Sequence, residues 1–310
     1  MKTINLKLGQ IPLNPRPFTL CLGFFDGVHQ GHQALLEAGK KLRLPLAVLT
    51  FSDHTAALSK NGSRQTLITP FNIKQKLFKR YGVDYLYVID FTAELKSLTP
   101  DEFITTVLNA LGPHNVIVGA DYRFGIQATG DGLYLANSPL ANFKTTIVPP
   151  VYNQAHQVIS STLTRKLILA GDMLAVHAQL GRHYQLQGRV QPGFGRGKSL
   201  GFPTANIHLD GAYLLPKNGI YVAYMTVDEQ DYLGIANIGI HPSLNRLDTP
   251  ILEVHLFDFH QSIYGHQVSV YFLYRLRDEI YFPQLSDLTK QMQEDKIQTL
   301  TWAKDHPLNK

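Results

Sequence analysis

The stretch that decides the fold is Gly23-Phe24-Phe25-Asp26-Gly27-Val28-His29-Gln30-Gly31-His32. It joins an apolar, strand-like run at 18–25 to a segment, 31–42, whose leucines recur at helical spacing. Residues 46–51 then repeat the pattern of a buried strand. A strand, a turn, a helix and a second strand of this size form a βαβ unit with parallel strands.

The alternation of helix and strand patterns continues to about residue 118. Residues 70–80 are predicted as a helix, and 84–89 and 115–118 as strands. Thr99 caps a further helix, with Pro100 at its first position and Glu102 placed for a capping box. The apolar stripe of that helix is Phe103, Val107, Leu108 and Leu111. This pattern predicts an α/β domain with a doubly wound parallel sheet.

The pattern changes after about residue 182. Short strands separated by Gly, Pro and Asn turns are predicted at 184–190, 219–227, 232–237, 251–257 and 267–272. They indicate an antiparallel β-barrel or sandwich, and the resemblance described below favours the barrel. A last helix, with Leu285, Leu288 and Met292 on one face, closes the chain. Residues 162–180 are predicted as one helix that bridges the halves. We therefore expect two domains, 1–181 and 182–310.

The composition of the chain limits the kinds of partner that it is expected to bind. A formal charge of +5 and a pI near 9.1 suit anionic ligands, but the basic residues are spread along the chain, so a nucleic-acid partner is not expected. The single cysteine, Cys21, fits a reducing cytoplasm. No apolar run approaches the length of a spanning helix, and no membrane partner is expected. The oligomeric state stays open.

The histidine turn offers a phosphate site. Two imidazoles three residues apart at a helix N-terminus face a volume that backbone N–H groups already make attractive to anions. Gly27 and Gly31 would let the backbone approach a ligand closely. A simple helix cap and a metal site are the alternatives for such a pair, but no cysteine or acidic cluster lies nearby in sequence to complete a metal site.

A second anion site is predicted at 160–165. Ser160, Ser161 and Thr162 place three hydroxyls at a probable helix start, and Arg165 follows one turn later. The alternative is a plain Ser/Thr cap with a solvated arginine.

A third site is predicted at 193–206. Its glycines and cations, Gly195, Arg196, Gly197, Lys198 and Gly201, suit a loop around a phosphate. The glycine spacing is not that of a Walker A loop. Thr204 and Asn206 offer neutral oxygens on one face of an extended segment, which suits Mg²⁺. A mobile surface hairpin is the alternative.

Several motifs, in order, resemble one family. The histidine turn resembles the Gly-x-Phe-Asp-Gly-x-His-x-Gly-His signature of HxGH nucleotidyltransferases, in particular the bacterial bifunctional riboflavin kinase/FMN adenylyltransferases, also called FAD synthetases. Residues 119–125 and 159–165 resemble two further motifs of that domain. Residues 193–206, 237–242, 252–259 and 276–279 resemble the riboflavin-kinase signature.

The resemblance implies two reactions and their residues. ATP would phosphorylate riboflavin to FMN and ADP, and a second ATP would adenylylate FMN to FAD with release of pyrophosphate. Glu253 would be the kinase general base with Mg²⁺ on Thr204 and Asn206, and His29, His32 and Arg165 would act in adenylyl transfer. The resemblance implies nucleotide contacts at Gly23, Phe25, Asp26, Gly27, Gly31, Ser160, Ser161, Thr162, Gly195, Arg196, Gly197, Lys198 and Gly201. It implies flavin contacts at His54, Asp121, Tyr122, Phe124, Phe202, Arg277 and Glu279.

One departure from the family pattern concerns the flavin pocket. The family has Pro-His-Pro after the second strand, whereas this chain has Asp53-His54-Thr55. Asp53 places a negative charge where an anionic FMN is expected to bind. A kinase without adenylyltransferase activity is therefore one alternative, and a flavin-sensing regulator without turnover is another. Serine at 243, where the family has threonine, keeps the hydroxyl.

Overall fold

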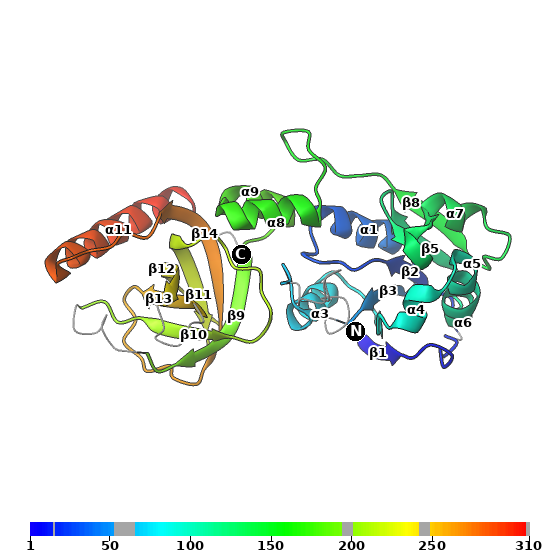
Figure 1. Cartoon of the computed structure of the whole chain (residues 1–310), viewed down its shortest axis with the longest axis horizontal. Coiled ribbons are helices and arrows are strands. Elements are labelled where there is room, and N and C mark those ends of the chain that lie inside the picture. Colours follow the sequence, from blue (N-terminus) through cyan, green and yellow to red (C-terminus); the bar gives the residue numbers. More distant parts are fainter. Residues whose placement is uncertain (15, 53–65, 194–200, 242–248, 308–310) are drawn as a thin grey trace. The chain divides into compact units, whose positions relative to one another are not determined.

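The computed structural model describes residues 1–14, 16–52, 66–193, 201–241 and 249–307. The chain divides into two compact units, Met1–Leu163 and Thr164–Lys310 (Figure 1). The predicted boundary between residues 181 and 182 falls inside the second unit.

The first unit is built on a six-stranded parallel sheet in the order β1-β4-β3-β2-β5-β8. The strands are β1 (Lys2–Leu6), β2 (Thr19–Leu22), β3 (Leu46–Phe51), β4 (Tyr85–Ile89), β5 (Asn115–Gly119) and β8 (Lys144–Val148). From β2 the chain builds outward through β3 and β4, and then returns to β5 on the other side of β2. The doubly wound sheet is thus confirmed, with its switch point between β2 and β5. The edge strands β1 and β8 were not predicted, because their exposed polar residues interrupt the apolar run that marks a buried strand.

Helices cover both faces of this sheet. On one face α1 (Gln30–Lys40) lies so close that a Cβ on Gly39 would meet Leu46 Cδ1 and Cys21 Sγ. On the other face the helical segment after Thr99 buries its stripe against alternate strand residues such as Leu20 and Leu22. The remaining elements are α3 (Phe71–Arg80), α4 (Ala93–Ser97), α7 (Gly132–Asn137), the short strands β6 (Arg123–Phe124) and β7 (Gly130–Asp131), and a 3₁₀ turn at Ile126–Ala128.

The segment after Thr99 confirms its predicted cap and stripe. Thr99 and Glu102 form the capping box, and Gly112 ends the helix with φ 71°. The sequence did not predict a π-helical turn in its middle. That turn separates α5 (Pro100–Phe103) from α6 (Asn109–Leu111) at Ile104–Leu108.

The second unit contains a closed antiparallel barrel in the order β10-β13-β12-β11-β14-β9 (Figure 1). Its strands are β9 (Tyr184–Gln191), β10 (Ala205–Leu209), β11 (Gly219–Val227), β12 (Gln230–His241), β13 (Thr249–Leu256) and β14 (Gln267–Arg277). The predicted barrel and its five predicted strands are confirmed. The sixth strand, β10, includes Asn206, which was predicted only as part of an extended segment.

Two helix predictions need correction. The single helix predicted at 162–180 is two helices, α8 (Ser161–Ala170) and α9 (Met173–Leu180). They part at Gly171, which has φ 78° and lies where a Cβ would meet Arg275 Cδ. The closing helix, α11 (Leu285–Asp305), is present, but Leu285 is 68% exposed. Its buried residues are instead the polar Asp295 and Thr299.

Candidate active sites

The turn between β2 and α1 brings His29 and His32 together at the carboxyl end of β2. His29 precedes α1, and its Nδ1 accepts a hydrogen bond from the backbone N–H of His32 at 3.3 Å. The two rings stack with their centroids 3.7 Å apart. Both imidazoles therefore lie at the N-terminus of α1, and this arrangement favours a bound anion.

The backbone of this turn is held in unusual conformations. Phe25 has φ 57° and Gly27 has φ 89°. The Asp26 carboxylate accepts a hydrogen bond from the Thr69 N–H at 3.1 Å, and its backbone carbonyl accepts one from the Ser161 hydroxyl at 2.7 Å. Phe25, Asp26 and Gly27 are buried. None of these three predicted phosphate contacts lines the cavity described next, and Asp26 holds the turn through its two hydrogen bonds.

A cavity of about 1160 Å³ opens beside the turn, where β2, β3, β5 and β8 end. This is the switch point of the sheet, the position at which open α/β folds bind ligands. The structure brings ten of the predicted residues into its lining. They are Gly23, His29, Gly31, His32, Asp121, Tyr122, Phe124, Ser160, Ser161 and Thr162.

A second helix N-terminus contributes to the same cavity. The Ser160 hydroxyl accepts a hydrogen bond from the Leu163 N–H at 3.2 Å and so caps α8. A Cβ on Gly31 would lie 3.3 Å from the carbonyl oxygen of Ile159, so the α1 and α8 starts approach closely. Their N–H groups make this lobe of the cavity suited to phosphates. Arg165 lies one turn further along α8, in the second unit.

The other lobe of the cavity is aromatic. The rings of Phe51 and Phe91 lie 4.6 Å apart, and those of Phe103 and Phe124 lie 5.5 Å apart. Tyr122 stacks on Phe124, and burial raises the pKa of its hydroxyl. Sequence reasoning missed Phe91 as a lining residue, although it follows the carboxyl end of β4, where ligand contacts are expected. This lobe can hold a planar aromatic group.

In the barrel, three strands align the candidate kinase residues. Glu253 on β13 is the register partner of Asn206 on β10 and of Asn237 on β12. The alternate residues Ile207 and Val254 are buried in the barrel. Since side chains alternate along a strand, the three polar residues share the opposite face.

Sequence reasoning did not identify Asn237 as a site residue. Its Oδ1 atom is buried and has no hydrogen-bond partner in the part of the chain that the structure describes. Buried amide oxygens normally have partners, so this acceptor is available for a donor from a ligand. The resemblance included it in the 237–242 motif without giving it a role; its register with Glu253 provides one.

His255, two residues after Glu253 on β13, contacts the segment that precedes Asn206. Its Nδ1 lies 2.9 Å from the carbonyl oxygen of Pro203, and its ring packs edge-on against Phe202 at 5.2 Å. Burial lowers the pKa of His255, so the neutral ring donates its Nδ1 proton to this carbonyl. The contact fixes Thr204, the next residue, beside β13.

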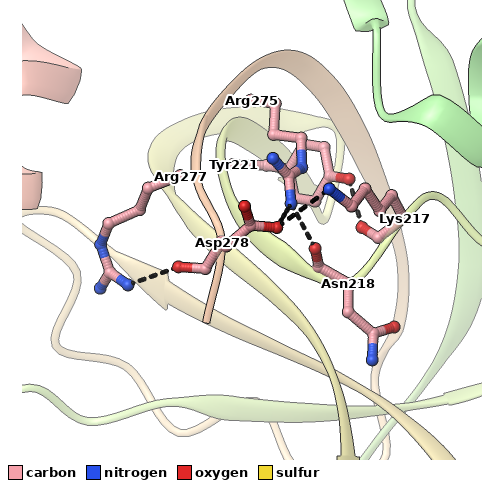
Figure 2. Close-up of polar contacts among 6 residues, drawn as sticks. All are labelled: Lys217, Asn218, Tyr221, Arg275, Arg277 and Asp278. Carbon is pink, nitrogen blue, oxygen red and sulfur yellow. Dashed lines mark hydrogen bonds and ion pairs between the residues drawn. The ribbon is translucent and has the colours of Figure 1, made fainter. Parts of the chain in front are cut away.

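A polar cluster holds the end of β14 (Figure 2). Arg275 Nη2 donates to the Asn218 carbonyl at 2.6 Å and to Asp278 Oδ1 at 2.5 Å. Lys217 Nζ approaches the same carboxylate at 3.1 Å, while the Tyr221 hydroxyl donates to the Lys217 carbonyl. Arg275 and Lys217 together hold the pKa of Asp278 below its usual range. The cluster fixes the position of Asp278, between two predicted flavin contacts.

Those two predicted flavin contacts differ in their surroundings. Arg277 forms a bidentate ion pair with Asp295 of α11, at 2.8 and 2.7 Å. Glu279 is exposed, and a Cβ on Gly239 would collide with its carboxylate, so it lies beside β12 near Asn237. Phe202 is 5% exposed, and Gly201 has φ 82°. The predictions for His54, Gly195, Arg196, Gly197 and Lys198, and the departures at Asp53, Thr55 and Ser243, concern residues outside the described ranges.

The described ranges were searched for metal-binding clusters and for membrane-spanning helices. They contain no group of three or more His, Cys, Asp or Glu side chains arranged to hold a metal. No helix within them is long and apolar enough to cross a membrane.

Comparisons with known proteins agree with this division. Residues 12–163 match the FAD synthetase family model, and residues 180–303 match the riboflavin kinase model. A Listeria monocytogenes bifunctional riboflavin kinase/FMN adenylyltransferase is 35% identical over 90% of both chains. The Bacillus subtilis protein of the same description is 32% identical over 91% of this chain and 92% of its own. A crystal structure from Streptococcus pneumoniae, described as a macrolide-efflux protein, superposes with a TM-score of 0.90 at 32% identity, covering 97% of this chain and 99% of that one.

The fold and the two matching family models define a transferase of phosphorus-containing groups. Within that class, the chain belongs to the family of bifunctional riboflavin kinase/FMN adenylyltransferases.

Proposed function

We propose that this chain phosphorylates riboflavin to FMN in its barrel and adenylylates FMN to FAD in its parallel-sheet unit, using ATP in both reactions. The observation that carries the proposal is the two-lobed cavity, which pairs an aromatic lobe with a lobe formed by two helix N-termini. The first suits an isoalloxazine ring and the second suits phosphates.

Adenylyl transfer needs positioning and charge stabilisation. A phosphate oxygen of FMN attacks the α-phosphorus of ATP, a new P–O bond forms, and the bond to the bridging oxygen breaks to release pyrophosphate. His29, His32 and the Thr162 hydroxyl stabilise the developing negative charge. The Ser161 hydroxyl, which donates to the Asp26 carbonyl, holds the histidine turn beside them.

Phosphorylation of riboflavin needs a base. The Glu253 carboxylate takes the proton of the primary ribityl hydroxyl as its oxygen attacks the γ-phosphorus of ATP, and ADP leaves. Asn206 and Thr204 would hold Mg²⁺, which neutralises phosphate charge when bound. The residues fit this ion, because neutral oxygens lie beside a carboxylate in one register row and the Asn237 oxygen there lacks a partner among the described residues. We also propose a cytoplasmic location, where ATP is available.

The proposal is tested by incubating the purified protein with riboflavin, ATP and Mg²⁺ and separating the products by chromatography. We expect FMN followed by FAD and pyrophosphate. FMN alone would show that the change to Asp53 and Thr55 has removed adenylyl transfer. Flavin binding without any product would support the regulator alternative instead.

Glu253→Gln tests the base assignment. It keeps the shape of the side chain but removes the proton acceptor, so FMN formation should fall by about 10²-fold or more. FAD formation from supplied FMN should be unchanged. Glu294→Gln, at an exposed position on α11, is the matched control. Kinase turnover of Glu253→Gln within a few-fold of the unaltered chain would refute the assignment.

A further inference from the structure

A fully buried lysine lies directly behind the histidine turn. Lys74, on α3, has 0% exposed surface. Its Nζ atom lies 3.2 Å from the carbonyl oxygen of Phe24 and 4.3 Å from the centroid of the Phe24 ring. Lysine is almost never fully buried, because removing an ammonium group from water is expensive unless partners compensate. Core packing alone would favour an apolar residue here.

Phe24 begins the strained part of the turn. The next residue, Phe25, has φ 57°, and the β-branched Val28 has φ 42°. Such conformations persist where surrounding contacts over-determine them, and they gather at functional sites. The Phe24 carbonyl accepts a second hydrogen bond, from the Thr50 hydroxyl at 3.0 Å. Two donors from separate elements therefore fix this one peptide.

Phe24 also belongs to the cavity. It lines the same cavity as His29 and His32. A rotation of the Phe24 peptide would displace the backbone that leads into both imidazoles. In addition, a buried positive charge behind this backbone acts through a poorly screened medium on the anions that the lobe receives.

We propose that Lys74 is a positioning residue for adenylyl transfer: it fixes the Phe24 peptide and places a buried positive charge behind the histidine turn. This inference rests on the proposed function. Lys74 does not line the cavity, so it acts through Phe24 on the reacting groups. The role differs from that of a purely structural lysine in its expected effect on turnover. Replacing a lysine whose role is purely structural would lower FAD formation only as far as it unfolds the protein, whereas replacing a positioning residue lowers the turnover of the protein that stays folded.

The test compares Lys74→Met with Lys74→Arg in the full-length protein. For Lys74→Met we expect a lower melting temperature but a protein that is still folded at the assay temperature. Its Michaelis constant for FMN should stay within about threefold, and its turnover number for FAD formation should fall at least about tenfold. Lys74→Arg keeps the charge and should recover most of that turnover. Lys79→Met, at an exposed position of the same helix, is the control.

Riboflavin phosphorylation in the same samples separates the possible failures. It should stay unchanged in all three variants, since it takes place in the second unit. If the unaltered chain makes FMN but no FAD, the proposed function fails. If it makes FAD and Lys74→Met does so at an equal rate, the positioning role fails. It fails equally if the loss of FAD formation in Lys74→Met matches the fraction of that variant that is unfolded at the assay temperature, or if Lys74→Arg is as slow as Lys74→Met.

Discussion

His183, directly before the first barrel strand β9, illustrates how burial changes the chemistry of one residue. Its ring lies 4.5 Å from that of His177 and stands edge-on to Tyr224 at 6.1 Å. Its Nδ1 atom is buried without a partner among the described residues. Burial, and then repulsion from His177, lower the pKa of His183 from 6.5 to about 4.

This pKa shift predicts a pH-dependent stability. The unfolded chain protonates His183 near pH 6.5, whereas the folded chain resists protonation until about pH 4. Its contribution to stability is therefore complete above pH 6.5 and is lost as the pH falls toward 4. His183→Gln should reduce the drop in melting temperature of the barrel between pH 7.5 and 5.0. The exposed His260→Gln should not, and equal drops in both variants would contradict the prediction.

The sequence revealed site residues where they belong to continuous motifs. The His29–His32 pair and the Ser160–Thr162 hydroxyls line the cavity as predicted. Lys74, Phe91 and Asn237 were missed for a shared reason. Each gains its place from a contact with a residue distant along the chain, and neither local spacing nor amphipathicity encodes that contact.

At the level of elements, α11 shows where apolar patterning gives an incomplete answer. Its presence near the end of the chain was predicted, but the residues it buries include Asp295, with 3% of the side chain exposed, and Thr299. Asp295 is buried because Arg277 of β14 pairs with it through two hydrogen bonds. An apolar stripe cannot predict a helix that docks through an ion pair. The break at Gly171 was missed similarly: only glycine fits this position, because a Cβ there would collide with Arg275 of β14, a residue distant along the chain.

Asp295→Ala should loosen α11. Removing one partner of a buried ion pair leaves the other charge unpaired, at a cost of about 3–5 kcal/mol. Trp302, the only tryptophan of the chain, stacks between Tyr274 and His306, so its fluorescence reports docking of this helix. The urea midpoint of that signal should fall.

The double variant Arg277→Met/Asp295→Leu distinguishes the ion pair from its surroundings. With both charges replaced by apolar side chains, most of the lost stability should return. Glu294→Ala, an exposed neighbour of Asp295, should leave the midpoint unchanged. If Asp295→Ala also leaves it unchanged, the ion pair does not anchor α11.

At the level of the whole molecule, each compact unit contains its own candidate chemistry. The cavity and its histidine turn lie within Met1–Leu163, and the Glu253 row lies within Thr164–Lys310. FMN, the product of one reaction, is the substrate of the other. If each unit functions by itself, FMN released by one chain can serve as substrate for another chain.

This independence predicts complementation between two variants. Glu253→Gln should convert supplied FMN to FAD but fail with riboflavin, while His32→Ala should stop at FMN because it lacks one of the paired imidazoles. Mixed with riboflavin, ATP and Mg²⁺, the two variants should make FAD at a rate that rises with the concentration of accumulated FMN. A trap that removes free FMN should abolish FAD formation by the mixture. If each variant performs its remaining reaction alone and the mixture still makes no FAD, FMN must pass between two sites of one chain.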